Sequence, residues 1–126
     1  MLTEPFTTHY LSEHYGDDAY RTLAGYESRG GFKGLRAVLQ REPGEVVVLV
    51  KASGLRGRGG AGFNTGLKWS FMPKGDERTK VLVCNGDESE PGSFKDRLIM
   101  ERGAFQILEG LLLAAWATGS QKSFIY

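Results

Sequence analysis

The stretch SGLRGRGGAGFNTGLKWSF, residues 53–71, combines a glycine-dense loop with three cationic side chains, Arg56, Arg58 and Lys68. Glycine lets main-chain N–H groups approach an anion closely, and it tolerates backbone conformations with positive φ that other residues avoid. Successive N–H groups of this kind form a concave nest that attracts negative charge. The stretch therefore predicts a loop that binds a phosphate group.

Within this loop, Gly57, Gly59 and Gly62 satisfy the dinucleotide-binding pattern G-x-G-x-x-G. That pattern normally follows directly on a strand and opens directly into a helix. Here residues 51–56 separate the apolar run 46–50 from the first glycine, so the fit to the pattern is partial. We expect a phosphate loop whose geometry differs from that of the ordinary Rossmann turn.

A helix is expected after the loop, starting at Gly66 or Leu67 with Thr65 as its N-cap. The alternative interpretation of the glycine-rich stretch is a mobile linker. Linkers rarely carry large aromatic side chains such as Phe63 and Phe71, which would have to remain in water. The ligand-binding loop is therefore the favoured interpretation.

A second informative segment begins with residues 80–85, whose aliphatic and β-branched run predicts a short buried strand. The loop that follows carries the carboxylates Asp87, Glu88 and Glu90. Ligands of open α/β sheets bind outside the carboxyl ends of the strands, and carboxylates there accept hydrogen bonds from ribose or ribityl hydroxyls. A solvated acidic turn is the alternative. No metal site is predicted, because Pro91 and the irregular spacing of oxygen donors do not suit a calcium loop.

Two long motifs, at residues 53–74 and at residues 82–97 (LVCNGDESEPGSFKDR), together resemble the F-type flavoprotein subunits of NADH:quinone oxidoreductase, respiratory complex I. Related diaphorase subunits of NAD-linked hydrogenases and formate dehydrogenases are an alternative within the same chemistry. A non-catalytic nucleotide-binding or assembly module is the alternative from another class. The resemblance implies an α/β fold, a Rossmann-like FMN-binding domain with a parallel sheet that is incomplete in this chain.

The resemblance also implies which residues bind the cofactor. The FMN phosphate and ribityl chain would lie in the glycine loop, formed by Gly57, Arg58, Gly59, Gly60, Ala61 and Gly62. Lys68 matches a lysine that contacts the flavin and would stabilise negative charge on it. The polar loop on the other side of the flavin corresponds to Asn85, Asp87 and Glu88.

For the nicotinamide nucleotide, the resemblance implies that Phe63 and Phe71 stack on the adenine and that Glu90 lies beside the ribose. Glu88 is expected to place opposing charge near this anionic ligand. Asn64 and Gly86 depart from the residues usual in the family, proline and alanine, but both are loop positions that leave the contacting side chains in place.

The mechanism that the resemblance implies is hydride transfer from NADH to FMN, followed by electron transfer to iron–sulfur clusters, with no acid or base catalyst in this chain. Family members are several times longer and hold a four-iron, four-sulfur cluster in later cysteine-rich segments. This chain has one cysteine, Cys84, which cannot hold a cluster alone. We therefore expect the amino-terminal portion of such a protein, inactive by itself, with NADH and the other subunits of the NADH dehydrogenase module as partners.

Composition narrows the class of protein. A formal net charge of +1, with 40% hydrophobic and 25% charged residues, favours neither a nucleic-acid-binding protein nor a disordered tail. The apolar run 111–117 is too short to span a bilayer, so no direct membrane insertion is expected. A lone cysteine fits a reducing compartment, and the resemblance implies a cytoplasmic location with membrane association through the complex.

The whole chain, 1–126, is expected to form part of one domain, with an arm at residues 1–30 and an α/β core portion at 31–126. Helices are predicted near 17–24 and at 34–40, 44–51, 95–101 and 104–118, and strands at 80–85 and 122–126. Segment 44–51 is ambiguous: its β-branched content favours a strand. The resemblance favours a helix, and we predict a helix.

Two helices show an apolar face that we expect to form the core. In the first the face consists of Leu35, Val38 and Leu39. In the longest it consists of Phe105, Leu108, Leu111, Leu112 and Trp116, and Gly119 is expected to end that helix before the last strand.

Overall fold

The computed structural model describes residues 9–75 and 77–126, so residues 1–8 of the expected arm lie outside the described residues. The elements follow one another as 3₁₀ helix η1 (Asp18–Arg21), α1 (Leu23–Ser28), α2 (Lys33–Val38), α3 (Pro43–Ala52), α4 (Thr65–Ser70), β1 (Val81–Cys84), α5 (Lys95–Arg102), α6 (Ala104–Thr118) and β2 (Lys122–Ile125). The helix expected near 17–24 is in fact two short helices, because Thr22 caps the start of α1 with its hydroxyl.

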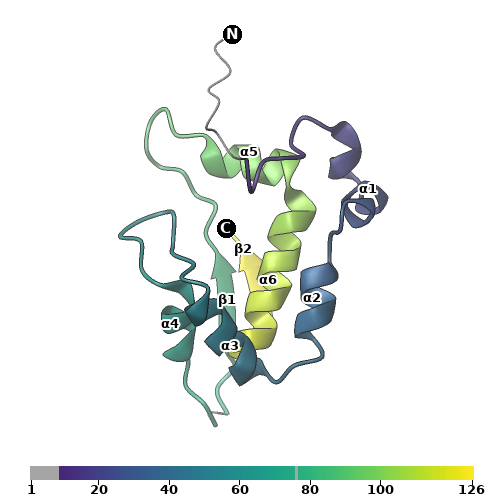
Figure 1. The fold of residues 1–126 in the computed structure, drawn as a ribbon. Coiled ribbons are helices and arrows are strands. Elements are labelled where there is room, and N and C mark those ends of the chain that lie inside the picture. The colour runs from purple at the N-terminus through teal and green to yellow at the C-terminus, as the bar shows by residue number, and fades with distance from the viewer. Residues whose placement is uncertain (1–8, 76) are drawn as a thin grey trace.

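Helix α6 is the axis of the molecule (Figure 1). Helices α1 and α2 lie on one side of α6, while α3, α4 and the two strands lie on the other, and α5 crosses one end. The helix ends as predicted, since Gly119 adopts a left-handed conformation with φ of 68° and closes the last turn.

Strands β1 and β2 form a parallel pair in which Val81 is opposite Lys122 and Cys84 is opposite Ile125. The chain runs between them through α5 and α6, because parallel strands require a long crossover connection. The predicted α/β class with a parallel sheet is thus confirmed.

The expectation that the first strand is buried is wrong. Val81 and Val83 are 44% and 57% exposed, whereas the alternating residues Leu82 and Cys84 are half-buried. A strand in a parallel sheet becomes buried only when helices cover both faces. Among the described elements, α6 is the helix that packs against the strand pair, so one face stays open.

The ambiguous segment is helix α3, as predicted. Pro43 occupies the first turn, where its missing N–H removes no hydrogen bond. Val46, only 1% exposed, anchors this helix against its neighbours α4 and α6. Tertiary packing thus outweighs the strand preference of β-branched residues.

Helix α4 starts one residue earlier than expected and has a different N-cap. Asn64, not Thr65, accepts the hydrogen bond from the backbone N–H of Leu67, at 2.8 Å. Helices α3 and α4 lie so close that a Cβ atom at Gly66 would be 2.1 Å from the backbone nitrogen of Lys51. Position 66 therefore admits only glycine.

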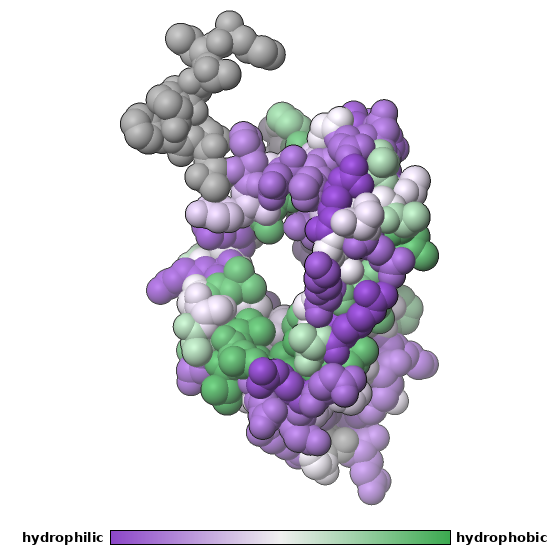
Figure 2. Space-filling view, turned by 45° about the vertical axis from the view of Figure 1, so that its right-hand side comes forward, coloured by the Kyte–Doolittle hydropathy of each residue, from purple (hydrophilic) through white to green (hydrophobic). Residues whose placement is uncertain are grey.

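The predicted apolar face of α6 is not its most buried surface. Leu108, Leu112 and Trp116 are each more than a third exposed, whereas Ala114 and Ala117 are buried together with Thr118. Small side chains let α3 and α4 approach the helix closely. Leu112 and Trp116 border the groove toward α2. Figure 2 shows one face of the molecule, with an opening in the middle and apolar surface on part of its margin.

A polar junction ties the arm to α6 through Glu109. Its carboxylate accepts hydrogen bonds from the Tyr26 hydroxyl at 2.5 Å, the Phe32 N–H at 2.8 Å and the Leu35 N–H at 3.0 Å. The last two groups belong to the first turn of α2, which has no side-chain cap of its own. Glu109 therefore caps α2 from a different helix.

Burial and hydrogen bonding in this junction shift the pKa values of Glu109 and Tyr26. Burial acts to raise the pKa of Glu109, but the hydrogen bonds from Tyr26, Phe32 and Leu35 outweigh it and hold the pKa below its ordinary value. The pKa of Tyr26 is raised, first by burial and then by its hydrogen bond to the carboxylate. Tyr26 also lies against the rings of Tyr20 and Phe32, with centroids 5.3 and 5.1 Å away.

Candidate functional site

The glycine loop projects from a narrow neck of paired backbone. Arg56 and Asn64 form an isolated antiparallel bridge. On either side of it, the Gly57 N–H donates to the Phe63 carbonyl at 2.9 Å, and the Thr65 N–H donates to the Leu55 carbonyl at 2.8 Å. The neck holds the two ends of the loop together and leaves residues 57–62 free to project.

The projecting part of the loop has the chemistry of an anion site. Within the part of the chain that the structure describes, the N–H groups of residues 58–62 donate to no acceptor. Gly62 has a φ of 67°, a conformation in which glycine is favoured. A Cβ atom added at Gly59 or Gly60 would meet nothing within 4 Å, so these glycines border open space. Successive unpaired donors at the edge of open space form a ready place for a phosphate.

This open space is a cleft of about 640 Å³ between the loop, α4 and β1. Of the predicted site residues, it brings together Gly57, Gly59, Gly60, Ala61, Gly62, Phe63, Lys68 and Asn85. It does not bring in Arg58, Phe71, Asp87, Glu88 or Glu90, which lie outside its lining. Lys68 comes from α4, and Asn85 directly follows the carboxyl end of β1.

The two predicted stacking aromatics form one pair beside the cleft. The rings of Phe63 and Phe71 have centroids 6.1 Å apart and are tilted by 53°. They are 49% and 65% exposed, which is unusual for two neighbouring phenyl rings. Their faces are available to a planar ligand.

The acidic loop after β1 is ordered by its own side chains. The Asn85 side-chain oxygen accepts from the Asp87 N–H at 3.0 Å, and the Ser89 hydroxyl donates to the Asp87 carboxylate at 2.6 Å. Asp87 and Glu90 are exposed. Both carboxylates can still accept hydrogen bonds from hydroxyl groups of a ligand.

Glu88 faces the protein rather than the cleft. Its carboxylate accepts from the backbone N–H groups of Asp96 at 3.0 Å and Arg97 at 3.2 Å, at the start of α5. The ammonium group of Lys95 lies 4.0 Å away, and the side chain is only 11% exposed. Glu88 thus caps α5, a role that its position in the sequence did not indicate.

Several further residues complete the cleft, and none of them was predicted from the sequence. They are Thr65, Trp69, Met72, Leu82, Val83 and Thr118. Thr65 and Trp69 belong to the quoted motif and could have been included on that ground. No sequence pattern near Thr118 indicates a binding role. The residue lines the cleft because the carboxyl end of α6 packs beside it.

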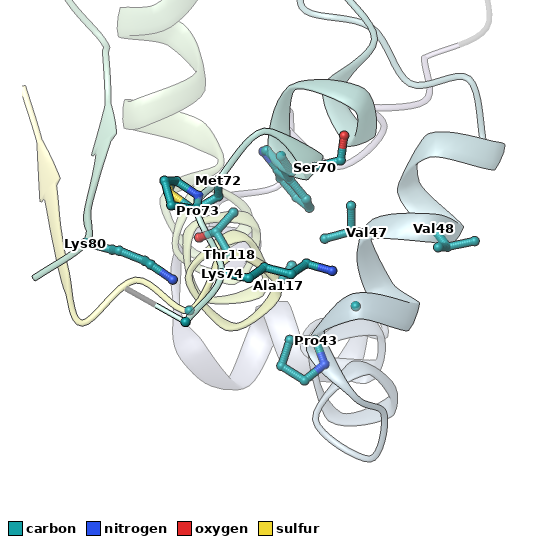
Figure 3. A pocket seen from close by; sticks show the side chains of 14 residues that line it. Pro43, Val47, Val48, Ser70, Met72, Pro73, Lys74, Lys80, Ala117 and Thr118 are labelled. Carbon is teal, nitrogen blue, oxygen red and sulfur yellow. The ribbon is translucent and has the colours of Figure 1, made fainter. Parts of the chain in front are cut away.

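A second cleft, of about 430 Å³, adjoins the first and is shown in Figure 3. Trp69, Met72 and Thr118 line both clefts. The second also contains Lys74 and Lys80, and its walls are largely apolar, with Pro43 and Val47 among them (Figure 3).

Neither a metal cluster nor a membrane-spanning helix is present in residues 9–75 and 77–126. No group of three or more His, Cys, Asp or Glu side chains lies close enough there to hold a metal ion. In the same residues no helix has the length and apolar character needed to cross a membrane.

The fold is that of an α/β protein, and a glycine loop with unpaired N–H groups beside the carboxyl end of a parallel strand is typical of the places where such proteins bind nucleotide phosphates. A family model described as the Nuo51 FMN-binding domain matches residues 50–126, which is more than half of the chain. The chain belongs to this family.

Related proteins agree with this assignment. The chain is 54% identical over 105 residues to the F 2 subunit of NADH-quinone oxidoreductase in Rhizobium meliloti (strain 1021), covering 82% of this chain and 25% of that protein. It is 45% identical over 122 residues to the F subunit of NADH-quinone oxidoreductase in Escherichia coli (strain K12), covering 94% and 27%. The chain therefore spans about a quarter of the length of these curated relatives.

Among solved structures, the chain resembles the NAD⁺-reducing [NiFe]-hydrogenase in its H₂-reduced state. The TM-score is 0.63 at 41% sequence identity, and the match covers 71% of this chain and 16% of the hydrogenase chain. The chain thus shares the fold of the matched part of that hydrogenase chain.

Proposed function

We propose that this chain forms the FMN- and NADH-binding part of the NADH dehydrogenase module of an NADH:quinone oxidoreductase. Its role there is in hydride transfer from NADH to FMN, with electrons passing onward to iron–sulfur clusters held outside this chain. One observation carries the proposal: the unpaired N–H groups of residues 59–62 border the same cleft as Lys68 and Asn85. Relatives named as F subunits of NADH-quinone oxidoreductase support it.

The residues present fit FMN. The loop N–H groups of residues 58–62 and the guanidinium of Arg58 would bind the phosphate. A cleft of about 640 Å³ offers room for an aromatic ring system, with Lys68 on one wall and Asn85 on another. When bound, FMN supplies the hydride-accepting chemistry, and the protein supplies position and electrostatics.

The remaining residues would serve the nicotinamide nucleotide and the ligand hydroxyls. Phe63 and Phe71 would stack on the adenine, because their exposed faces lie beside the cleft. Asp87 and Glu90 would accept hydrogen bonds from hydroxyl groups. Glu88 would contribute to cofactor binding by fixing this acidic loop against α5, since its carboxylate already accepts two backbone hydrogen bonds.

The proposal includes other subunits of the NADH dehydrogenase module as partners, because the relatives are named as subunits of a larger enzyme. It places the protein in the cytoplasm, with membrane association through those partners. In the relatives' complexes the four-iron, four-sulfur clusters would lie in parts of the protein beyond this match.

The test is a titration with FMN, monitored by quenching of flavin fluorescence, of this chain together with its native partner subunits. Gly59→Val fills the cleft, while the open space around Gly59 lets the free protein accept the larger side chain. We expect Gly59→Val to weaken FMN binding at least tenfold. Gly16→Val is the matched control, because Gly16 also borders open space but lies outside the cleft. Absence of binding in the wild type, or equal binding in both variants, would contradict the proposal.

A diaphorase subunit of an NAD-linked hydrogenase or formate dehydrogenase is the second candidate, favoured by the structural match to the NAD⁺-reducing hydrogenase. Isolation of the protein from its source with its native partners decides between the two. Co-purification with hydrogenase or formate dehydrogenase subunits would select the second candidate. Binding of FMN that NADH does not reduce, even with all partners present, would instead indicate a non-catalytic module.

A further inference from the structure

Asn64 lies where α3, α4 and the glycine loop meet, and both ends of its side-chain amide are used. The carbonyl oxygen accepts from the Leu67 N–H at 2.8 Å, in the first turn of α4. The amide nitrogen donates to the Lys51 carbonyl at 3.3 Å, near the end of α3. These are groups that helix ends leave without intrahelical partners. One side chain thus links the end of one helix to the start of the next.

The link is made at the point where the two helices touch. The backbone of Lys51 is the surface that closes off position 66 to any side chain. No side chain separates α3 from α4 there. A hydrogen bond between Asn64 and Lys51 therefore fixes the position of α4 relative to α3. The Lys51 carbonyl also accepts from the Gly54 N–H at 3.3 Å, which ties the start of the connection between α3 and the loop to the same point.

Asn64 is at the same time part of the neck of the glycine loop. Its backbone pairs with Arg56, and the guanidinium of Arg56 donates to the Gly62 carbonyl at 3.2 Å on the far side of the loop. A displacement of Asn64 would therefore move the neck, and with it the N–H groups of residues 58–62. Lys68 would move separately, because it is carried by α4.

We propose that Asn64 is a positioning residue: its amide holds the glycine loop in a fixed position relative to Lys68, so that both act on one phosphate-bearing aromatic ligand. This inference rests on the proposed function in taking FMN as that ligand. It assigns Asn64 no direct contact with the ligand, and Asn64 does not line the cleft.

The side chain of asparagine suits this task because it has a donor and an acceptor at sufficient reach. Serine at position 64 would still cap α4, since it is a good N-cap residue, but its short hydroxyl would not extend to Lys51. Serine also adds no charge near an anionic ligand. Alanine would remove both bonds. Asn64→Ser and Asn64→Ala therefore separate the link to α3 from the cap of α4.

The test measures residue-resolved amide hydrogen exchange in the 126-residue chain without ligand. In Asn64→Ser, we expect exchange at Gly57 and Thr65 to rise about fivefold, the equivalent of one neutral hydrogen bond, with exchange at Leu67 within about twofold of the wild type. In Asn64→Ala, exchange should rise at all three residues. Ser70→Ala removes a hydroxyl that bonds only within α4 and should change none of them.

FMN titration supplies the second measurement. Asn64→Ser should weaken FMN binding about fivefold, while Ser70→Ala leaves it unchanged. Exchange at Gly57 and Thr65 that stays at the wild-type rate in Asn64→Ser would overturn the proposal. So would faster exchange with unaltered FMN affinity. If the wild type binds no FMN, the proposed function fails, and the exchange data alone decide whether Asn64 holds the loop.

Discussion

Two regions along α6 have opposite character. Near the middle of the helix, Glu109 meets three donors from the arm and α2, and both oxygens of its carboxylate accept hydrogen bonds. At the carboxyl end, Thr118 borders a cleft in which the N–H groups of residues 59–62 have no acceptor within the described chain. In the first region the polar groups form hydrogen bonds within the protein. In the second the N–H groups remain available to a ligand.

This difference separates stability from function within one small chain. Backbone N–H groups that are paired internally contribute to the folded state, and those left unpaired are candidates for a ligand. Substitutions at the Glu109 junction should therefore change the free energy of unfolding. Substitutions in the glycine-loop cleft should change ligand affinity and leave unfolding almost unaltered.

The largest effect is expected for Glu109→Ala. It would leave Tyr26, Phe32 and Leu35 without their shared acceptor, and α2 without a cap, at a cost of about 3 kcal/mol in the free energy of unfolding. Urea denaturation followed by circular dichroism measures this cost. Glu27→Ala is the control, because Glu27 makes only an exposed ion pair with Arg36 and should cost about 0.5 kcal/mol. Equal effects of the two variants would contradict a structural role for the junction.

The next largest effect is expected for Lys68→Ala, and it should lower the affinity for FMN. Loss of a charge-assisted bond to FMN would cost about 1.5–3 kcal/mol, roughly ten- to a hundredfold in affinity, with unfolding almost unchanged. Fluorescence titration and urea denaturation of the same variant measure both quantities. Lys33→Ala removes the same charge from α2, away from the cleft, and should leave FMN affinity unaltered. A Lys68→Ala protein that unfolds more easily but binds FMN normally would show that Lys68 stabilises the fold rather than binding the ligand.

Glu88→Ala would test whether Glu88 belongs with the stabilising region. Removal of a helix cap costs about 1 kcal/mol, and the loss should be felt first at the start of α5. Amide exchange at Asp96 and Arg97 is the direct measurement. Glu90→Ala should leave both amides unaffected. Normal protection of the two amides in Glu88→Ala would show that the cap is not needed.

Acidification should have the smallest effect, because a protonated Glu109 can still accept hydrogen bonds. The folded-state pKa of Glu109 lies below its unfolded value, so its contribution to stability is present above the unfolded pKa and is lost as the pH falls through the folded pKa. Unfolding curves measured between neutral and acidic pH should show this loss in the wild type. In Glu109→Gln the dependence on pH should be flatter. An identical pH dependence in both proteins would exclude Glu109 as its source.

Much of the fold was predictable from local sequence. The limits of α6 follow from the apolar run and Gly119, and α5 and the strands lie within a residue or two of their predicted bounds. The predictions of burial that were wrong concern residues whose neighbours lie far away in the sequence. The burial of Ala114 and Ala117 reflects the close approach of α3 and α4, and no periodicity of apolar residues reports that approach.

The candidate site divides in the same way. The glycine loop, Lys68 and Asn85 meet in one cleft, and the motifs together with the family resemblance that they carry indicated them. The partners of Glu88 were not predictable, because a carboxylate on a loop gives no sign of which helix start it will reach. Glu109 was missed altogether, since its nearest partner in sequence lies 74 residues away. Motifs thus indicated the groups left for a ligand better than those that hold the fold.

The residues that line both clefts include a tryptophan, whose fluorescence can report on ligand binding. That residue is Trp69, and the only other tryptophan, Trp116, lies in the groove beside Leu35 and Leu39, with its indole N–H donating to the Arg41 carbonyl at 3.2 Å. A flavin in the first cleft would therefore lie beside Trp69 and quench its emission. Trp116→Phe would leave a protein whose single indole emission follows ligand occupancy directly.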